Sequence, residues 1–262
     1  MLKLEHVNIT FHRNTVNENH ALKDINLHLK PGDFATIIGS NGAGKSTLLN
    51  AISGTYPIDS GNILLNGQYI TYQKEYKRAK HIGHLFQNTL KGTAPNMTIE
   101  ENMGLAYSRG KRRGLSRGLK KQDTELFREH LRQLDLGLED RLKTKVGLLS
   151  GGQRQAVTLL MATIVTPSLL LLDEHTAALD PKTAEQVMKI TDRIVQKNQI
   201  TTLMITHNIQ NALEFGNKTI VMSQGRIVLE LDKEQRKQMT VEKLMELYST
   251  AAHDQFSDKM IL

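Results

Sequence analysis

The stretch that decides the fold is Phe34–Asn50, which reads FATIIGSNGAGKSTLLN. The first five residues are a short apolar run typical of a buried strand, and from Ser46 onward the sequence has helical character. Between them stands the pattern G-x-x-x-x-G-K-S. A glycine-rich loop between a strand and a helix binds phosphate, because bare backbone N–H groups and the helix N-terminus point at the phosphate oxygens. The sequence therefore predicts a nucleotide site here.

The residues of this loop have separate expected roles. Lys45 should reach the β- and γ-phosphates, and the Ser46 hydroxyl should bind Mg²⁺. By average residue usage, such a match arises by chance in about one chain in a hundred of this length. The loop alone leaves kinases, GTPases and many ATPases open. The residues expected to hold the nucleotide here are Gly39, Ser40, Asn41, Gly42, Ala43, Gly44, Lys45, Ser46 and Thr47.

Length and composition limit the kinds of fold and site that the chain can form. The 262 residues suffice for one α/β domain, or for a core with a smaller inserted subdomain. The absence of cysteine excludes disulfides, thiolate metal sites and iron–sulfur clusters. The first ten residues alternate like a half-exposed strand and lack the apolar core of a secretory signal, so we expect a cytoplasmic chain. The net charge of +7 permits attraction to nucleic acid, anionic lipid or nucleotides without choosing among them.

The pattern along the chain predicts a phosphate-loop α/β core with an N-terminal antiparallel β-region and an inserted α-helical subdomain. Asn66-Gly67 favours a hairpin turn, residues 123–136 form the best helix of the charged middle segment, and strands and helices alternate from Gln155 on as in a parallel sheet. The expected divisions are residues 1–88 and 155–232 for the two parts of the core, 89–154 for the helical subdomain and signature, and 233–262 for a peripheral helical tail.

Residues 149–153, LSGGQ, resemble the signature motif of ATP-binding-cassette proteins. A serine hydroxyl, two glycines and a helix N-terminus suit a γ-phosphate, although the motif standing alone would be read first as a helix cap. About twenty residues later, the apolar run LLLLDE at 169–174 ends in two carboxylates, as does the Mg²⁺-binding strand of phosphate-loop NTPases. A solvated strand end is the plainer reading of those acids, and the order and spacing of the motifs favour the functional one.

The resemblance covers nearly all of residues 1–230 and implies a site for ATP and Mg²⁺. Asp173 would hold the metal through water, and Glu174 would polarise the attacking water as general base. Gln87, in HLFQN, resembles the family glutamine that contacts Mg²⁺ and the water and joins the core to the helical subdomain. His207, in ITHN, resembles the switch histidine that contacts the γ-phosphate. The implied catalytic residues are thus Glu174, His207 and Gln87, and the implied metal residues are Ser46, Gln87 and Asp173.

Further residues are expected to bind the nucleotide. Phe11 is the candidate aromatic for stacking on adenine, with a core phenylalanine as the alternative. Asp180, in AALDP, resembles the loop that crosses between subunits. The family arrangement implies a head-to-tail homodimer in which each ATP lies between one phosphate loop and the partner's signature. The signature residues involved are Ser150, Gly151, Gly152 and Gln153.

Two departures from the family pattern stand out. His175 takes the place of the usual proline after the glutamate, which changes loop geometry and local response to pH. The helix after the signature, residues 155–163, lacks the usual arginines. A dense basic run at 109–121 is read first as a solvated loop, next as a contact with anionic lipid and last as a nucleic-acid surface.

The resemblance implies an ATPase subunit of a membrane transporter. Its expected partners are a second copy of the chain, separate membrane-spanning permease subunits and an extracellular substrate-binding protein, with no nucleic acid. It would sit on the inner face of the membrane through the permease. Residues 173–181 resemble a subgroup of uptake-system ATPases, some for aromatic amino acids. One alternative is a soluble cassette ATPase of translation or DNA repair, which is disfavoured by the single cassette and by the short separation of Lys45 from Ser150. The other is a small-molecule kinase, which would not need LSGGQ.

Overall fold

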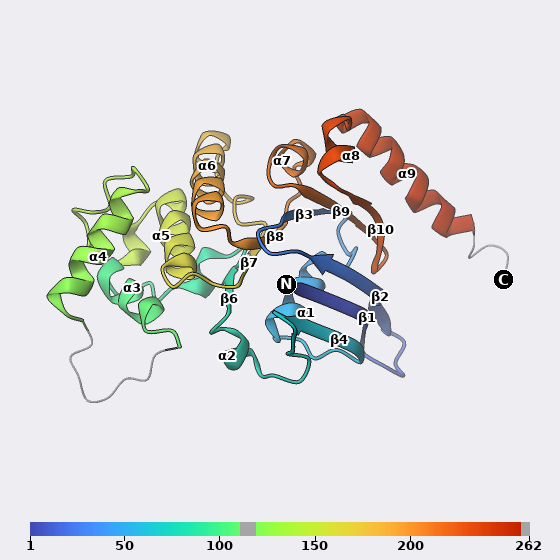
Figure 1. The fold of residues 1–262 in the computed structure, drawn as a ribbon, viewed down its shortest axis with the longest axis horizontal. Coiled ribbons are helices and arrows are strands. Elements are labelled where there is room, and N and C mark those ends of the chain that lie inside the picture. The colour runs from blue at the N-terminus through green and yellow to red at the C-terminus, as the bar shows by residue number, and fades with distance from the viewer. Residues whose placement is uncertain (111–118, 258–262) are drawn as a thin grey trace. The chain divides into compact units, whose positions relative to one another are not determined.

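Strand β3 (Phe34–Ile38) lies at the centre of the arrangement that carries the phosphate loop. In a computed structural model describing residues 1–110 and 119–257, it pairs in parallel with β8 (Thr201–Ile205) and β9 (Lys218–Ser223), and β10 (Arg226–Leu231) adds antiparallel to β9 (Figure 1). All five residues of β3 are buried, as expected of a parallel strand covered on both faces. The carboxyl end of β3 leads into the loop and then into helix α1 (Lys45–Ser53).

The described structure divides into two compact units, Met1–Arg78 with the chain from Thr201 onward, and Ala79–Ile200. Both units mix helices and strands, and the predicted α/β fold with a phosphate-loop core, an antiparallel β-region and a helical subdomain is confirmed.

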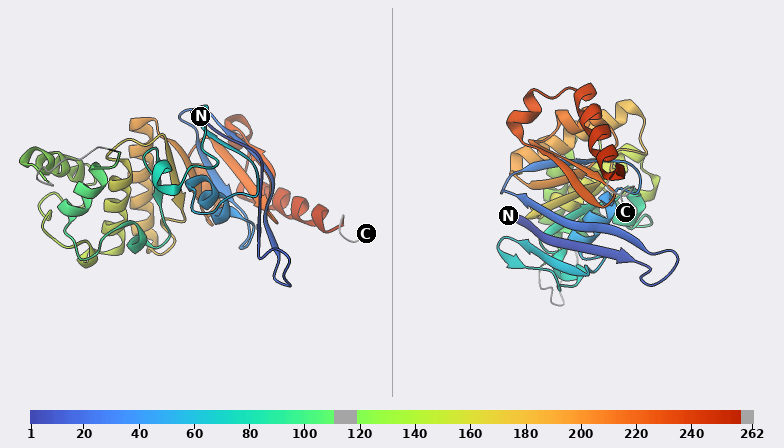
Figure 2. Two further views of the ribbon diagram at one scale, coloured as in Figure 1. Left: turned by 90° about the horizontal axis from the view of Figure 1, so that it is seen from below. Right: turned by 90° about the vertical axis from the view of Figure 1, so that its right-hand side faces the viewer.

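The first unit also holds the antiparallel region. One sheet, in the order β2-β1-β4-β5, is formed by strands β1 (Leu2–Phe11), β2 (Asn19–Leu29), β4 (Ser60–Leu65) and β5 (Gln68–Tyr69) (Figure 2). The predicted turn at Asn66-Gly67 joins β4 to β5, and both residues have positive φ, 53° and 77°, as a tight hairpin requires.

Helices cover this unit's C-terminal half. Helix α7 (Ile209–Glu214) follows β8, and the predicted helical tail consists of α8 (Lys233–Lys237) and α9 (Val241–Ser257). The short helix α2 (Glu75–Arg78) closes the N-terminal half of the unit. Asp232 caps α8 by accepting hydrogen bonds from the Glu234 and Gln235 amides, which explains why a new helix starts there.

The second unit holds the strand that ends in two carboxylates. Strands β6 (Ile82–Leu85) and β7 (Leu169–Asp173) pair in parallel, and α6 (Pro181–Asn198) follows β7. Helices α3 (Ile99–Tyr107), α4 (Lys121–Arg132) and α5 (Gly151–Thr163) pack on one another through a core that includes Phe127 and Leu131. Two 3₁₀ turns, Thr89–Gly92 and Val146–Leu148, complete the unit.

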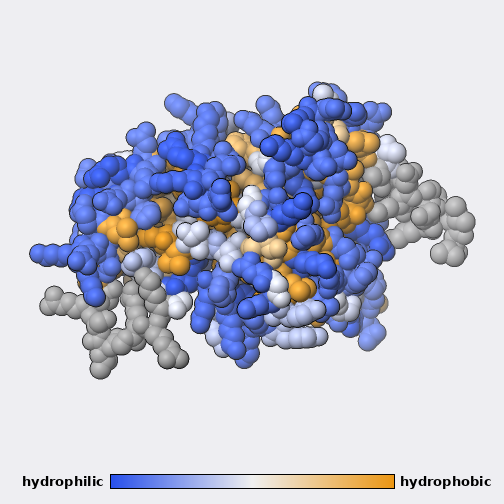
Figure 3. Space-filling model, viewed as in Figure 1, coloured by the Kyte–Doolittle hydropathy of each residue, from blue (hydrophilic) through white to orange (hydrophobic). Residues whose placement is uncertain are grey.

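Helix α4 differs from its predicted bounds of 123–136. It begins two residues earlier and ends at Arg132, because Asp135 takes a left-handed backbone conformation with φ 55° that a helix cannot continue. In the described parts of the chain, no helix has both the length and the apolar character that crossing a bilayer demands. Figure 3 shows one face on which hydrophilic residues dominate and hydrophobic ones form smaller patches.

Candidate nucleotide-binding site

Two glycines of the phosphate loop stand where a side chain would collide with the backbone. A Cβ atom on Gly39 would lie 2.2 Å from the Met222 carbonyl oxygen, and one on Gly44 would lie 2.5 Å from that of Ala21. Gly44 also has φ 98°, in the left-handed region that strongly favours glycine. The first and third glycines of the motif are therefore required by close backbone approach, which is why the loop can turn so tightly between β3 and α1.

Lys45 is held across this loop. Its side chain is part of a residue only 5% exposed, and its Nζ donates hydrogen bonds to the carbonyl oxygens of Gly39, at 2.7 Å, and Ser40, at 2.9 Å. A buried ammonium is costly unless it is hydrogen-bonded, and these carbonyls satisfy that need. The arrangement keeps a positive charge at the loop, where a polyphosphate is attracted to it.

The first unit brings His207 beside the phosphate loop. His207 follows β8, and the Asn208 side chain then caps α7 by accepting a hydrogen bond from the Asn211 amide at 3.0 Å. Gly39, Ser40 and His207 line one pocket of about 190 Å³ in this unit. Two sequence motifs some 170 residues apart, the loop and the switch histidine, thus meet as the family resemblance implies.

Phe11 lies at the end of β1, half-buried, and packs edge-to-face against Tyr56, with ring centroids 5.3 Å apart. Tyr56 is 38% exposed and follows α1. Sequence reasoning missed Tyr56. Its position two residues after Gly54, which ends α1, could have indicated a second aromatic near the loop. The pair offers a ring surface of the kind that stacks on a base.

In the second unit the structure brings Gln87 and Glu174 together. Gln87 follows β6 and Glu174 follows β7, and the Gln87 side-chain Nε2 donates a hydrogen bond to Glu174 Oε2 at 3.1 Å. Asp173, the last residue of β7, directly precedes Glu174. The Glu174 backbone is left-handed, with φ 47°, a conformation uncommon for a residue with a side chain and typical of strained functional sites.

His175 anchors the segment that follows Glu174. It is 3% exposed, and its Nε2 lies 3.2 Å from the Thr191 hydroxyl on α6. That hydroxyl donates its proton to the Val187 carbonyl oxygen at 2.8 Å, so His175 Nε2 must be the donor to Thr191. Burial lowers the pKa of His175 to about 4, which keeps the imidazole neutral near pH 7. The histidine that replaces proline is thus a structural anchor to α6.

The signature residues begin helix α5. The Ser150 hydroxyl accepts from the Gln153 amide, and the Gln153 side chain accepts from the Ser150 amide, both at 3.3 Å. This is a capping box, so the helix-cap reading of the motif holds whether or not it binds phosphate. A Cβ atom on Gly152 would lie 2.2 Å from the Thr183 side chain, which explains that glycine by packing alone.

Asp180 likewise caps α6, accepting a hydrogen bond from the Thr183 amide at 3.1 Å. Hydrogen bonds from Thr183 lower the pKa of the Asp180 carboxyl, which is therefore charged near neutral pH. The described second unit leaves Asp180 exposed. Its geometry is that of a cap facing solvent.

Three arginines that sequence reasoning missed each hold the C-terminal end of a helix that follows a predicted site motif. Arg78 Nη1 donates to the Ala51 and Ile52 carbonyls of α1, at 2.8 and 2.9 Å. Burial lowers the pKa of all three guanidinium groups, which stay charged because arginine titrates so high. They satisfy the carbonyls that a helix end leaves unpaired and complement its negative dipole end.

The other two arginines act on α7 and α5. Arg236 Nη2, from α8, donates to the Ala212 and Leu213 carbonyls of α7 at 2.9 and 2.8 Å. Arg109 Nη2 donates to the Ala162 carbonyl of α5 at 2.9 Å and to that of Val165 at 2.7 Å. Arg109 is the first residue of the basic run predicted to be a solvated loop, and for this residue the prediction is wrong. Residues 111–118 of the run lie outside the described residues.

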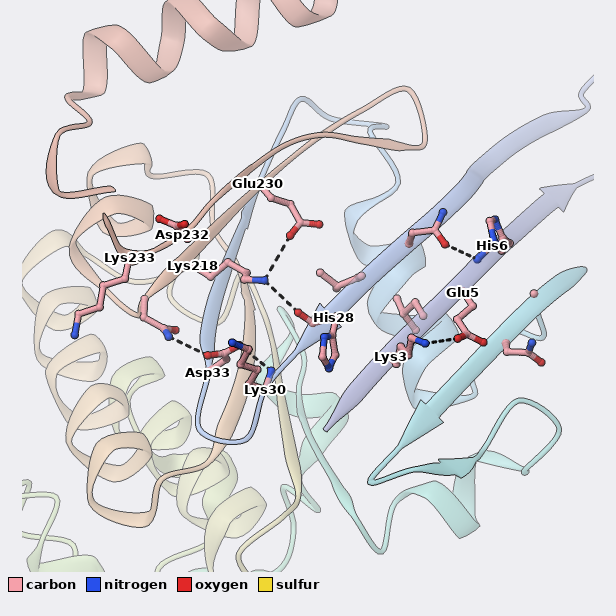
Figure 4. Close-up of a pocket in the computed structure, with 16 residues that line it drawn as sticks. Lys3, Glu5, His6, His28, Lys30, Asp33, Lys218, Glu230, Asp232 and Lys233 are labelled. Carbon is pink, nitrogen blue, oxygen red and sulfur yellow. Dashed lines mark hydrogen bonds and ion pairs between the residues drawn. The ribbon is translucent and has the colours of Figure 1, made fainter. Parts of the chain in front are cut away.

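A second, larger hollow in the first unit contains none of the predicted site residues. This groove of about 960 Å³ lies among β1, β2, β9 and β10 and is lined by charges of both signs (Figure 4). Lys3 and Glu5 form an ion pair of 2.5 Å, and Lys218 Nζ donates to the His28 carbonyl oxygen at 3.1 Å. Because acidic and basic groups alternate and pair, the groove presents no net positive surface for a polyphosphate.

The chain resembles known proteins over most of its length. Residues 22–177 match the family model described as ABC transporter. The chain is 42% identical to the tyrosine transport ATP-binding protein of Clostridioides difficile, over 96% of this chain and all of that protein. It is 35% identical to the thiamine import ATP-binding protein of Yersinia pseudotuberculosis, over 87% and 88% of the two chains.

The chain is also similar in fold to solved structures of ATP-binding cassettes. The fold is similar to that of a dimeric ATP-binding cassette in a post-hydrolysis state with ADP and phosphate bound, with a TM-score of 0.76 and 30% identity. The match covers 89% of this chain and 99% of that one.

Proposed function

Because this chain belongs to the ABC transporter family and is an ATPase, we propose that it powers the uptake of a small solute, an amino acid, through separate permease subunits. The observation that carries the proposal is end-to-end similarity to a tyrosine transport ATP-binding protein, which this chain matches over the whole of that protein's length. The subgroup resemblance of residues 173–181 agrees with an aromatic amino acid as the substrate.

ATP binding is assigned to the phosphate loop of the first unit. Loop amides and the buried Lys45 ammonium bind the phosphates, His207 contacts the γ-phosphate, and Phe11 stacks on the adenine. The support is the tight loop geometry and the pocket that the loop shares with His207.

Mg²⁺ is the metal that the family resemblance implies. Ser46, Gln87 and Asp173 offer a hydroxyl, an amide and a carboxylate, which are the hard oxygen ligands that this ion prefers alongside phosphate and water. When bound, the ion would neutralise charge on the β- and γ-phosphates. The residues named here are the ones that would hold it.

Glu174 is the proposed general base. Its carboxylate is oriented by the Gln87 amide, which donates to Oε2. A carboxylate held in this way would accept a proton from the attacking water. His175 fastens the following residues to α6 and so fixes the position of this loop. Gln87 and Glu174 together hold the attacking water in place.

The proposed assembly is a head-to-tail homodimer. Each ATP would lie between the phosphate loop of one chain and Ser150, Gly151, Gly152 and Gln153 of the other, with Asp180 at the crossing. Support comes from the dimeric cassette with ADP and phosphate to which the fold is similar. Permease subunits would hold the dimer at the inner face of the membrane, and an extracellular binding protein would deliver the solute.

Three experiments test this function. Lys45→Ala should lose tight ATP binding, and near-normal turnover at saturating Mg-ATP would overturn the assignment of the site. Mild detergent extraction followed by purification of this chain should recover a hydrophobic permease. Recovery of the chain without one, with its ATPase activity intact, would favour a soluble cassette ATPase. Uptake of radiolabelled tyrosine by vesicles with the complete system then tests the substrate class.

A further inference from the structure

Helix α9 is docked on the first unit by a few apolar side chains. Leu244 is fully buried in a cluster with Ile38, Ala212, Val221 and Leu231, and Tyr248 packs against the same cluster. Ile38 is the residue directly before the phosphate loop. The helix therefore rests on the strand end from which the loop departs.

Tyr248 also reaches the loop itself. The Ser40 backbone amide donates a hydrogen bond to the Tyr248 hydroxyl at 3.0 Å, across 208 residues of sequence. Leu244, Met245 and Tyr248 of α9 line the same pocket of about 190 Å³ as Ser40 and His207. One face of α9 thus adjoins both elements of the first unit proposed to contact phosphate.

The peptide groups around Ser40 are fixed from two directions. Lys45 binds the carbonyl oxygens of Gly39 and Ser40, while Tyr248 binds the Ser40 amide. A loop held in its binding geometry before the ligand arrives loses less conformational entropy when the ligand binds. Removing one of these bonds should therefore weaken ligand binding more than it affects the chemical step.

From this geometry we propose that Tyr248 is a positioning residue for the phosphate loop, and that docking of α9 through it raises the affinity for ATP. The inference rests on the proposed function. Tyr248 touches neither nucleotide nor metal in this assignment and acts through Ser40. The C-terminal helix becomes part of the ATP-binding apparatus, although it lies outside residues 22–177 that match the family model.

The test compares Tyr248→Phe with Tyr72→Phe. Both remove one phenolic hydroxyl, but Tyr72 is 95% exposed and serves as the matched control. Loss of one hydrogen bond should weaken ATP binding about fivefold in Tyr248→Phe, with turnover at saturating ATP unchanged. Tyr72→Phe should bind ATP as the parent does. Titration calorimetry with ATP and steady-state kinetics measure the two quantities.

Amide hydrogen exchange distinguishes the loss of the Tyr248–Ser40 hydrogen bond from a general loss of packing. Exchange of the Ser40 amide should speed up in Tyr248→Phe, while amides of β8 and β9 keep their parental rates. Unchanged ATP affinity together with unchanged Ser40 exchange overturns the inference. The Lys45→Ala variant distinguishes a failure of the Tyr248 inference from a failure of the proposed function. If that variant loses ATP binding while Tyr248→Phe behaves as the parent, only the role of Tyr248 is wrong. If Lys45→Ala still binds ATP tightly, the proposed function fails.

Discussion

The side-chain amide of Gln87 lies 3.1 Å from the carboxylate of Glu174, each at the carboxyl end of one of two paired parallel strands. Strand pairing therefore places a hydrogen-bond donor beside the proposed base. The amide orients the carboxylate without neutralising it, which suits a group that must accept a proton.

Glu174→Gln should keep ATP binding and lose hydrolysis by a factor of about 100 or more, because an amide can still hydrogen-bond but cannot act as a base. Phosphate release and equilibrium ATP binding, measured on the same preparation, check this expectation. Loss of binding and turnover together would instead make Glu174 a structural residue. Glu185→Gln, on the exposed face of α6, is the control and should behave as the parent.

Stability should fall on mild acidification because of His84. Burial lowers the pKa of His84 to about 4 in the folded chain, against an ordinary value of 6.5. Between these values the unfolded chain binds more protons, so the free energy of unfolding is undiminished above pH 6.5 and declines as the pH falls towards 4. The decline from this one group approaches roughly 3 kcal/mol.

His84→Leu should reduce that acid sensitivity. No hydrogen-bond partner of His84 Nε2 is found among the described residues, so an apolar side chain leaves no broken bond there. Urea unfolding at pH 7.5 and at pH 5 should show a smaller loss of stability in the variant than in the parent. His175 titrates in the same window and keeps part of the effect. An equal loss of stability in the parent and in His84→Leu would contradict the role of His84 in acid sensitivity.

Arg78→Met should destabilise the first unit by about 2 to 4 kcal/mol, because several buried carbonyls lose their donor at once. The guanidinium donates to four carbonyl oxygens, those of Ala51, Ile52, Thr71 and Gln73. Chemical unfolding measures the effect. Arg13→Met removes only an exposed ion pair with Asp59 and should cost under about 1 kcal/mol. Similar costs for the two variants would contradict the role given to Arg78.

ATP should convert Glu174→Gln from monomer to dimer, because uncleaved nucleotide stays between two anion-binding surfaces. ADP should not. Light scattering with each nucleotide reports the change. Mixing Lys45→Ala with Ser150→Arg chains should restore one intact site per mixed dimer. A Glu174→Gln protein that stays monomeric at millimolar ATP, with no site recovered in the mixture, would refute the shared site.

Local sequence predicted the features that depend on neighbouring residues. The loop at 39–46, the Asn66-Gly67 turn and the strand ending at Asp173 are each built from a short contiguous pattern, and all three appear as expected. The end of α4 was missed because a left-handed Asp135 leaves no distinctive pattern in sequence.

Long-range contacts to backbone groups escaped prediction. Arg109 looked like part of a solvated basic run, yet it binds the Ala162 carbonyl of α5, 53 residues away. Tyr248 binds an amide 208 residues away. Every residue has a backbone carbonyl and nearly every residue has a backbone N–H group. The residue type therefore does not indicate which backbone group a distant side chain will bind. Only the folded chain shows which backbone groups lie within reach.

The left-handed backbone of Glu174 places two opposing demands on this position, low backbone strain and a catalytic carboxylate. A glycine or asparagine there would adopt φ 47° with less strain, but either replacement would remove the proposed base. The need for ATP hydrolysis is what favours glutamate at this position. In a lineage that no longer needed transport, selection would no longer oppose a glycine or asparagine at position 174.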